Sequence, residues 1–282
     1  MTFLQILLLG LVQGAAELLP VSSSAHVIVV EKLLGLDPAR PEMTFLLVML
    51  HTGTMFAVIG YFWRAWRERY FSSAAAFRKI VVLSVIATGF TGAVGLVLKH
   101  LIEKIFLGHG DIELLFGNLF LVGAALAAAG GLILWSGRNR SPAGPERALD
   151  WRAASWIGAV QGLCLPFRGF SRSGATISTG LLLGVGRMRL EEFSFALAVV
   201  LTPLAIGREL LRLLKAHGQD GGHLHLGALL GPGLLGMVCS FAAGLLALKF
   251  LSRLLESGRW SLFGYYCLAA AGGVLLLAAS GF

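Results

Sequence analysis

Long apolar runs separated by short charged stretches make up most of this chain. A run of about 20 apolar residues has the length that a helix needs to cross a hydrocarbon core of roughly 30 Å. We therefore predict membrane-spanning helices over residues 43–63, 80–98, 113–136, 192–207, 225–248 and 261–281. The fourth of these stretches is short and contains Pro203, so its ends are the hardest to set from sequence.

Two further apolar stretches differ because a polar cluster interrupts each of them midway. Residues 3–34 are broken around Pro20, and residues 153–185 are broken around Pro166. Both clusters begin with Gln-Gly, pass a proline and end in several hydroxyl residues, so they resemble each other. The apolar arms are too short to cross a bilayer. We predict that each stretch forms a re-entrant helical hairpin that returns on its own side of the membrane.

The distribution of Lys and Arg sets the orientation. With six spans and two hairpins, the loops on one side carry 14 of the 23 cations and those on the other side carry 7, while Arg168 and Arg172 lie within the second hairpin. The richer side should face the cytoplasm, which places both termini outside. Eight full crossings would give a weaker bias of 12 to 9.

The two hairpins then enter from opposite sides, and each is followed by three spans. The predicted fold class is an all-α polytopic membrane protein, with six transmembrane helices plus two re-entrant helical hairpins in an inverted-topology repeat. The chain would be a single integral membrane domain over residues 1–282, with repeat halves at approximately 1–136 and 153–282. In such a repeat the broken helices meet near the midplane of the bilayer, where a ligand site can form.

The composition agrees with a membrane protein and excludes several other classes. The chain is 56% hydrophobic and 13% charged, with a mean hydropathy of +0.80, which no soluble domain of this size needs. Its net charge of +8 is scattered over short loops, as expected from membrane topology and not from a nucleic-acid surface. The cysteines are odd in number and lack metal-type spacing, so we interpret Cys164, Cys239 and Cys267 as small packing residues.

An anion site is predicted in the second cluster. Small and hydroxyl residues at a helix start leave backbone N–H groups free at the positive end of the helix dipole. Arg172 adds a planar fork that suits phosphate oxygens. An ordinary serine cap with a snorkelling arginine accounts less well for so many polar groups in one hairpin. The candidate ligands are Arg168, Gly169, Ser171, Arg172, Ser173 and Thr176.

The first cluster adds a carboxylate and a proton carrier. Gln13 and Glu17 are four residues apart and share a helix face. A carboxylate buried there needs a cation, either a metal or an arginine. Histidine is a common proton carrier in proteins, so His26 is a candidate for that role, although a packing histidine fits its sequence equally well. Nucleophilic or phosphate-binding hydroxyls are offered by Ser22, Ser23 and Ser24.

These motifs resemble the undecaprenyl-pyrophosphate phosphatase family of the bacitracin-resistance type. That family carries (Glu/Gln)-x-x-x-Glu, then Pro-Val-Ser-Ser-x-x-His, and later Pro-Gly-x-Ser-Arg-Ser-x-x-Thr. The matching segments here are Gln13–Glu17, Pro20–His26 and Gly169–Thr176, and the resemblance covers nearly the whole chain. One departure is Arg168, which stands where the family usually has proline.

The resemblance implies removal of the terminal phosphate from undecaprenyl (C55) pyrophosphate, which recycles the carrier lipid for peptidoglycan synthesis and gives bacitracin resistance. It implies a divalent cation, Mg²⁺ or Ca²⁺, held by Glu17 with Gln13. Arg172 would clamp the pyrophosphate, Ser23 would attack the phosphorus or orient a water, and His26 would be the general base or acid. It also implies the bacterial inner membrane, with the site open to the periplasmic side. The expected partners are the lipid substrate and the bilayer, with no nucleic acid and with the oligomeric state, including a homo-oligomer, left open.

Two other function classes fit part of the pattern. A polyprenyl-phosphate flippase, or a dual phosphatase and flippase, would also use an inverted repeat. A phosphatidic-acid-type phosphatase would need a later His with Asp, and the loop histidines His100, His109, His223 and His225 lack that pattern. His51 interrupts the span 43–63. It fits either a residue that supports the site from behind or a polar group that packs between helices, and we favour the packing interpretation.

Overall fold

The computed structural model of the chain describes residues 1–37, 41–106, 108, 112–138, 146–220 and 226–281. The described residues are helical with no strand, and six of the helices are long and apolar enough to cross a membrane. The α-helices are α1 Phe3–Leu18, α2 Ser23–Leu33, α3 Pro41–Arg69, α4 Ala74–Leu101, α5 Leu119–Arg138, α6 Trp151–Cys164, α7 Arg172–Leu182, α8 Arg187–Asp220, α9 Leu226–Glu256 and α10 Ser261–Ala279. The predicted class, an all-α polytopic membrane protein, is confirmed.

Several boundaries were predicted wrongly because charged residues continue the long helices. α3 runs on to Arg69 and α8 begins at Arg187, so most of the predicted loops 64–79 and 186–191 is helical. At the end of α3, cations in the last turn complement the helix dipole. At the start of α8 the dipole gives no such support, but the long arginine side chains can reach the polar head groups. α8 also continues through Pro203, because a transmembrane helix tolerates a proline when neighbouring groups satisfy the freed backbone.

α5 starts six residues later than predicted, at Leu119 instead of residue 113. A 3₁₀ turn covers Ile112–Leu115. The side chain of Asn118 then accepts hydrogen bonds from the N–H groups of Phe120 and Leu121, at 3.0 and 3.2 Å. The start of this helix is therefore set by a local polar cap, which apolar run length alone does not reveal.

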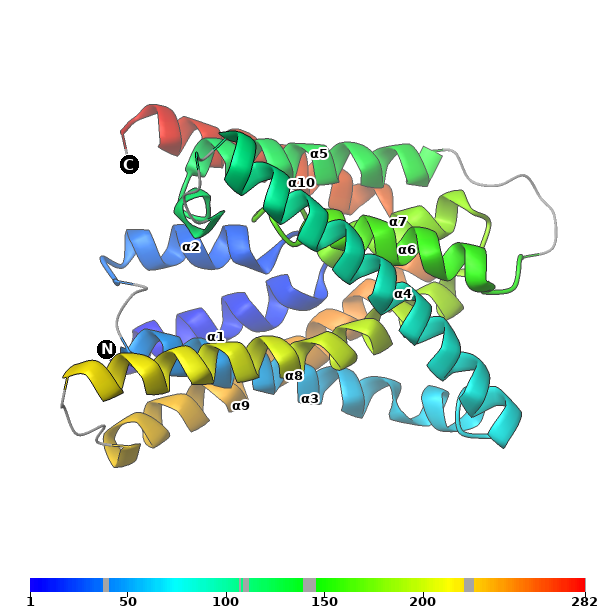
Figure 1. The fold of residues 1–282 in the computed structure, drawn as a ribbon, viewed down its shortest axis with the longest axis horizontal. Coiled ribbons are helices and arrows are strands. Elements are labelled where there is room, and N and C mark those ends of the chain that lie inside the picture. The colour runs from blue at the N-terminus through cyan, green and yellow to red at the C-terminus, as the bar shows by residue number, and fades with distance from the viewer. Residues whose placement is uncertain (38–40, 107, 109–111, 139–145, 221–225, 282) are drawn as a thin grey trace.

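Both polar clusters lie at turns between antiparallel helices. Figure 1 shows α2 returning toward the end of the bundle where the N-terminus lies, while α6 and α7 form a similar pair that starts from the opposite end. Both pairs turn back within the bundle, as the hairpin interpretation requires. That these pairs are re-entrant in a bilayer stays a prediction.

The first helices of the two hairpins make corresponding contacts. α1 packs on α9 and α6 packs on α4, while α5 packs on α10 and α3 on α8. A glycine follows the glutamine of each cluster and allows these helices to pack closely. An added Cβ on Gly14 would lie 2.5 Å from the Ser240 carbonyl oxygen in α9, and an added Cβ on Gly162 would lie 2.8 Å from the Thr91 carbonyl oxygen in α4. The division into two repeat halves stays a prediction that these matched contacts support.

The main apolar cluster connects both hairpins to the long helices. It contains Leu18 and Val21 from the first hairpin and Ile177 from the second, each at most 5% exposed. All three cysteines are free. Cys267 is fully buried, and its thiol donates to the Pro20 carbonyl at 3.3 Å, so it packs directly against the first turn. The first hairpin turn is thus packed against α10 and within the main apolar cluster.

Candidate active site

A cavity of about 300 Å³ lies between the two hairpin turns. Residues from both hairpins line it, together with residues from α3 and α8. Its polar lining consists of Glu17, Ser22, Ser23, Ser24, His51, Gln161, Arg168, Ser171, Arg172, Ser173 and Thr202. The structure therefore brings together eight of the twelve predicted site residues.

The two turns touch each other directly at this cavity. The Arg172 Nη2 donates to Glu17 Oε1 at 3.1 Å, and the Ser173 hydroxyl donates to the Leu19 carbonyl at 3.2 Å. The backbone N–H of Gly169 donates to the Ser24 hydroxyl at 3.3 Å. These bonds join residues about 150 positions apart in the chain, so the site is assembled from both clusters.

Glu17 is the central group of the first turn, and both of its carboxylate oxygens are engaged. Oε1 accepts from Arg172, while Oε2 accepts from the Ser23 hydroxyl and from Gln13 Nε2, the latter at 3.4 Å. Gln13 is 1% exposed and is not among the lining residues, so it holds Glu17 from behind. A serine that donates to a carboxylate is arranged to lose its proton to it.

Two helix N-termini point at the cavity. α7 begins at Arg172 after an N-cap at Ser171, whose hydroxyl accepts from the Gly174 N–H at 3.2 Å. α2 begins at Ser23, and its N-cap Ser22 has φ +68°, a strained conformation for a residue with a side chain. Helix starts carry free N–H groups and partial positive charge, which suits an anion.

Arg172 is the cation best placed to add to that positive potential. Its Nη1 is buried and has no hydrogen-bond partner among the described residues, while its Nη2 pairs with Glu17. A buried guanidinium nitrogen without an acceptor is costly, and a phosphate oxygen in the cavity would satisfy it.

The second arginine of this hairpin has a different environment. Arg168 lines the cavity but is exposed, and its guanidinium carbon lies 4.4 Å from the centre of the Phe116 ring. The adjacent Gly169 has φ +102°, and an added Cβ would lie 2.3 Å from the Val122 carbonyl oxygen. The turn after Arg168 therefore requires glycine, whereas Arg168 itself points to an aromatic side chain.

The two histidines near the first turn are placed differently. His26 is outside the lining, and its Nδ1 donates to the Ser22 carbonyl while its Nε2 accepts from the Tyr266 hydroxyl, both at 2.8 Å. His51 lines the cavity, and its Nδ1 donates to the Leu47 carbonyl at 2.8 Å, which leaves Nε2 as an acceptor. The interpretation of His51 as a packing residue is therefore corrected. An ionisable residue within an apolar span was the signal for it.

Two further residues differ from the prediction: Thr176 lies outside the cavity lining and Gln161 belongs to it. Thr176 is 1% exposed and lies outside the lining, because its hydroxyl donates to the Arg172 carbonyl at 2.8 Å and bonds to Ser194 at 2.6 Å. Gln161, which was not predicted as a site residue, lines the cavity, and its buried Oε1 has no hydrogen-bond partner in the part of the chain that the structure describes. Its position at the start of the second cluster, matching Gln13 in the first, was the signal for it.

The donor set suits a divalent cation only in part. Glu17 is the one carboxylate in the lining, and the described residues contain no group of three His, Cys, Asp or Glu side chains able to hold a metal. Mg²⁺ is commonly bound by one or two carboxylates together with substrate phosphates, so Glu17 fits as the one protein ligand of a cation that a pyrophosphate brings. Gln13 directs its nitrogen to Glu17 and lies outside the lining, which does not favour it as a ligand.

Comparisons with known proteins agree on one family. The model of the family described as bacitracin resistance protein BacA matches residues 6–273. Undecaprenyl-diphosphatase 2 of Acinetobacter baylyi is 58% identical, over 99% of this chain and 99% of that protein. Undecaprenyl-diphosphatases of Desulfosudis oleivorans and Korarchaeum cryptofilum are 37% and 32% identical, over 95% and 98% of this chain and 96% and 100% of those proteins. The aligned regions include both hairpin turns and the cavity between them.

Proposed function

Because the chain belongs to the bacitracin resistance protein BacA family and hydrolyses undecaprenyl pyrophosphate, we propose that the cavity between its two hairpin turns is the active site. The reaction yields undecaprenyl phosphate and inorganic phosphate, and it supports cell-wall synthesis and bacitracin resistance. The observation that carries the proposal is the contact of Arg172, Glu17 and Ser23 at two converging helix N-termini.

The pyrophosphate would be held mainly by the second turn. Arg172 reaches it with its unpaired nitrogen, and the backbone N–H groups at the start of α7 add further donors. Ser171 and Ser173 line the same wall, as do Ser22 and Ser24 on the opposite turn. Donors that are already in position stabilise the charge that develops as the phosphoryl group is transferred.

Ser23 is the proposed nucleophile. Its oxygen bonds to the terminal phosphorus while the bond to the bridging oxygen breaks, and its proton passes to Glu17, so that undecaprenyl phosphate leaves. Water then attacks the phosphoserine, inorganic phosphate is released, and Ser23 regains a proton from Glu17. In the alternative, Ser23 orients a water that attacks the phosphorus directly. The hydrogen bond from Ser23 to Glu17 supports the first route.

His51 is the better placed proton acceptor for the water step. Its Nε2 is an acceptor in the cavity wall, whereas both ring nitrogens of His26 are already bonded. We assign general base catalysis in that step to His51, and we assign to His26 the positioning of the first turn through Ser22. This replaces the catalytic role that the sequence suggested for His26.

A divalent cation, Mg²⁺ or Ca²⁺, belongs to the proposal as a companion of the pyrophosphate. It would neutralise phosphate charge, with Glu17 as its protein ligand. The Glu17 carboxylate would thus both bind the cation and accept the hydrogen bond from Ser23, while the hydrogen bond from Gln13 keeps that carboxylate in place.

The cavity also suits a lipid tail. Its apolar lining includes Leu165, Phe167 and Leu201, of which the first two are more than a third exposed. The protein is a multi-pass membrane protein. We propose the bacterial inner membrane as its location and, as the family resemblance implies, an opening of the cavity toward the periplasmic side. The positive-inside rule would place the end of the bundle that carries the basic loops in the cytoplasm.

The test measures phosphate release from undecaprenyl pyrophosphate by purified protein in detergent. Wild type, Glu17→Ala, His26→Ala and Arg172→Ala are compared with and without chelator. Wild-type rates in both the Glu17 and Arg172 variants would overturn the site. Release of phosphate also separates hydrolysis from lipid flipping alone.

A second experiment decides the nucleophile. Brief reaction with substrate labelled at the terminal phosphate, followed by acid quenching, should leave label on Ser23. Full activity in Ser23→Ala would exclude covalent attack by this residue and would favour direct attack by water.

A further inference from the structure

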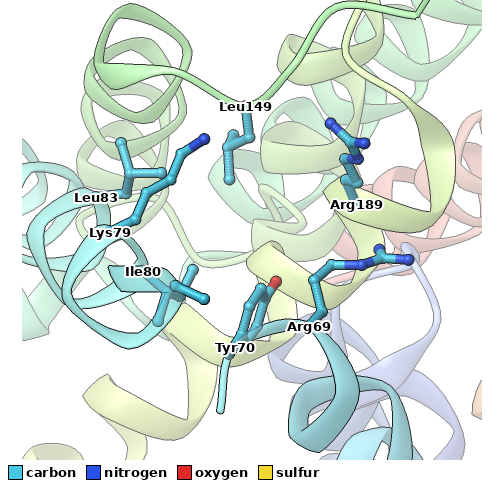
Figure 2. A pocket seen from close by; sticks show the side chains of 8 residues that line it. Arg69, Tyr70, Lys79, Ile80, Leu83, Leu149 and Arg189 are labelled. Atoms are coloured by element: carbon cyan, nitrogen blue, oxygen red, sulfur yellow. The ribbon is translucent and has the colours of Figure 1, made fainter. Parts of the chain in front are cut away.

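A second cavity, of about 260 Å³, lies at the end of the bundle that carries the basic loops. Three cations from three helices surround it: Arg69 at the end of α3, Lys79 near the start of α4 and Arg189 in the first turn of α8. Figure 2 shows Lys79 and Arg189 on opposite sides of this cavity, with the Tyr70 hydroxyl directed into the space between them. No residue of this cavity lines the active site.

Two of the three cations have no direct ion-pair partner among the described residues, and the Glu192 carboxylate that binds Arg69 also attracts Arg189. Arg69 donates to both carboxylate oxygens of Glu192 at 2.9 Å, which neutralises it. Within the described part of the chain, Lys79 and Arg189 make no hydrogen bond or ion pair. Two like charges facing one cavity repel each other, and an anion between them would relieve that repulsion.

The remaining lining is apolar. Leu83 and Leu149 form part of it and are only 6% and 8% exposed, and Ile80 lies beside them. Burial raises the pKa of Tyr70 above its ordinary value, so its hydroxyl stays protonated and able to donate. The cavity therefore offers cations and one hydroxyl donor next to hydrocarbon.

Exposed aromatic residues indicate that this cavity lies at the membrane boundary. Trp63, Phe71 and Phe77 are 54%, 51% and 47% exposed, and Phe71 lies between the other two, with ring centres 6.2 and 5.6 Å apart. These residues flank the α3–α4 turn that supplies Arg69 and Lys79. Trp is enriched at the head-group level of a bilayer, so the exposed Trp63 supports this position for the turn.

We propose that this cavity binds the phosphate head group of an anionic phospholipid from the leaflet on the side of the basic loops. Lys79 and Arg189 hold the phosphate, the Tyr70 hydroxyl donates to it, and an acyl chain follows Ile80 and the lipid-exposed side of α4. Basic pockets between helices on the cytoplasmic side are suited to such head groups. The proposal rests on contacts separate from those of the active site.

The experiment is native mass spectrometry of the detergent-purified full chain titrated with phosphatidylglycerol or phosphatidylcholine. We expect wild type to retain phosphatidylglycerol preferentially, and the double variant Lys79→Gln/Arg189→Gln to bind it about 30-fold more weakly, since each cation near an anionic lipid contributes about 1 kcal/mol. Arg64→Gln/Arg67→Gln is the matched control, because it removes the same charge from the same end of the bundle outside the cavity. Phosphate release by each variant shows whether it is folded.

Several results would overturn the proposal. The first is that wild type and Lys79→Gln/Arg189→Gln bind phosphatidylglycerol equally well. The second is that the matched control loses as much phosphatidylglycerol affinity as Lys79→Gln/Arg189→Gln. Equal retention of phosphatidylcholine would show a site for hydrocarbon without charge recognition. Displacement of the lipid by millimolar inorganic phosphate would indicate a soluble anion instead. If the double variant does not fold, Lys79→Gln alone should weaken binding about 5-fold, and unchanged binding would refute the proposal.

Discussion

Arg172→Lys should lower kcat of undecaprenyl pyrophosphate hydrolysis far more than it changes KM. The guanidinium uses one nitrogen for Glu17 at 3.1 Å, and its second, buried nitrogen has no hydrogen-bond partner among the residues that the structure describes. Its planar fork can therefore hold the carboxylate and a phosphate oxygen at once. A lysine keeps the positive charge beside Glu17 but presents a single ammonium on a different stem, so it loses one of the two contacts.

The size of the effect follows from that one contact. Removing a preorganised donor that faces developing charge costs roughly 10²–10³ in kcat, or about 2.7–4 kcal/mol. KM should change by less than about tenfold, because the positive charge and the helix N-termini still attract the pyrophosphate. Lysine is a cleaner probe than alanine, since Arg172→Ala would also leave the half-buried Glu17 without its partner.

The assay is phosphate release in detergent, with kcat and KM determined separately and thermal unfolding recorded for each variant. Arg168→Lys is the matched control, since Arg168 lines the same cavity but is exposed and lies over the Phe116 ring. We expect it to change kcat by less than about tenfold, because solvent-screened contacts contribute little. Arg172→Lys with a kcat within threefold of wild type would refute this reasoning, and so would equal losses in both variants.

Three further predictions follow from the same geometry. His51→Ala should lower kcat by about 10²-fold or more, whereas His26→Ala should lower it far less; the reverse pattern would return the proton transfer to His26. Gly158→Ala should lower the melting temperature, because the added Cβ would lie 2.1 Å from a backbone carbonyl oxygen of α4; we expect a loss of roughly 1–3 kcal/mol in the free energy of unfolding. Gly89→Ala is the control, because its Cβ would lie in open space and should leave the melting temperature unchanged. Equal melting temperatures in the two variants would contradict the close approach of α4 and α6. Chelation should abolish phosphate release and Mg²⁺ or Ca²⁺ should restore it, and full activity in chelator would remove the cation from the mechanism.

The sequence determines much of this architecture. The length of the apolar runs determined the six spans, because a bilayer core of fixed thickness demands a minimum helix length. The polar clusters around Pro20 and Pro166 stood out because polar groups within such sequence are costly unless they serve a site. The Arg-Ser-rich second cluster already indicated an anion, and the motifs identified the family.

The ends of the helices were less readable, because a charged residue does not stop a helix. The basic residues after position 63 remain helical as far as Arg69, and Pro203 lies inside α8 instead of ending it. Hydropathy reports where a helix leaves hydrocarbon, whereas backbone hydrogen bonds and local caps decide where the helix itself ends.

The sequence by itself determined that this chain is a helical membrane protein with two related polar turns and the residue types of a phosphate site. Only the tertiary structure decided which of those residues face one another. It pairs Arg172 with Glu17 and leaves Arg168 on an aromatic ring, and it places His51 in the cavity while His26 is bonded elsewhere. The physical reason is that helix periodicity determines the face from which a side chain projects, whereas its partner depends on which distant helix packs against that face.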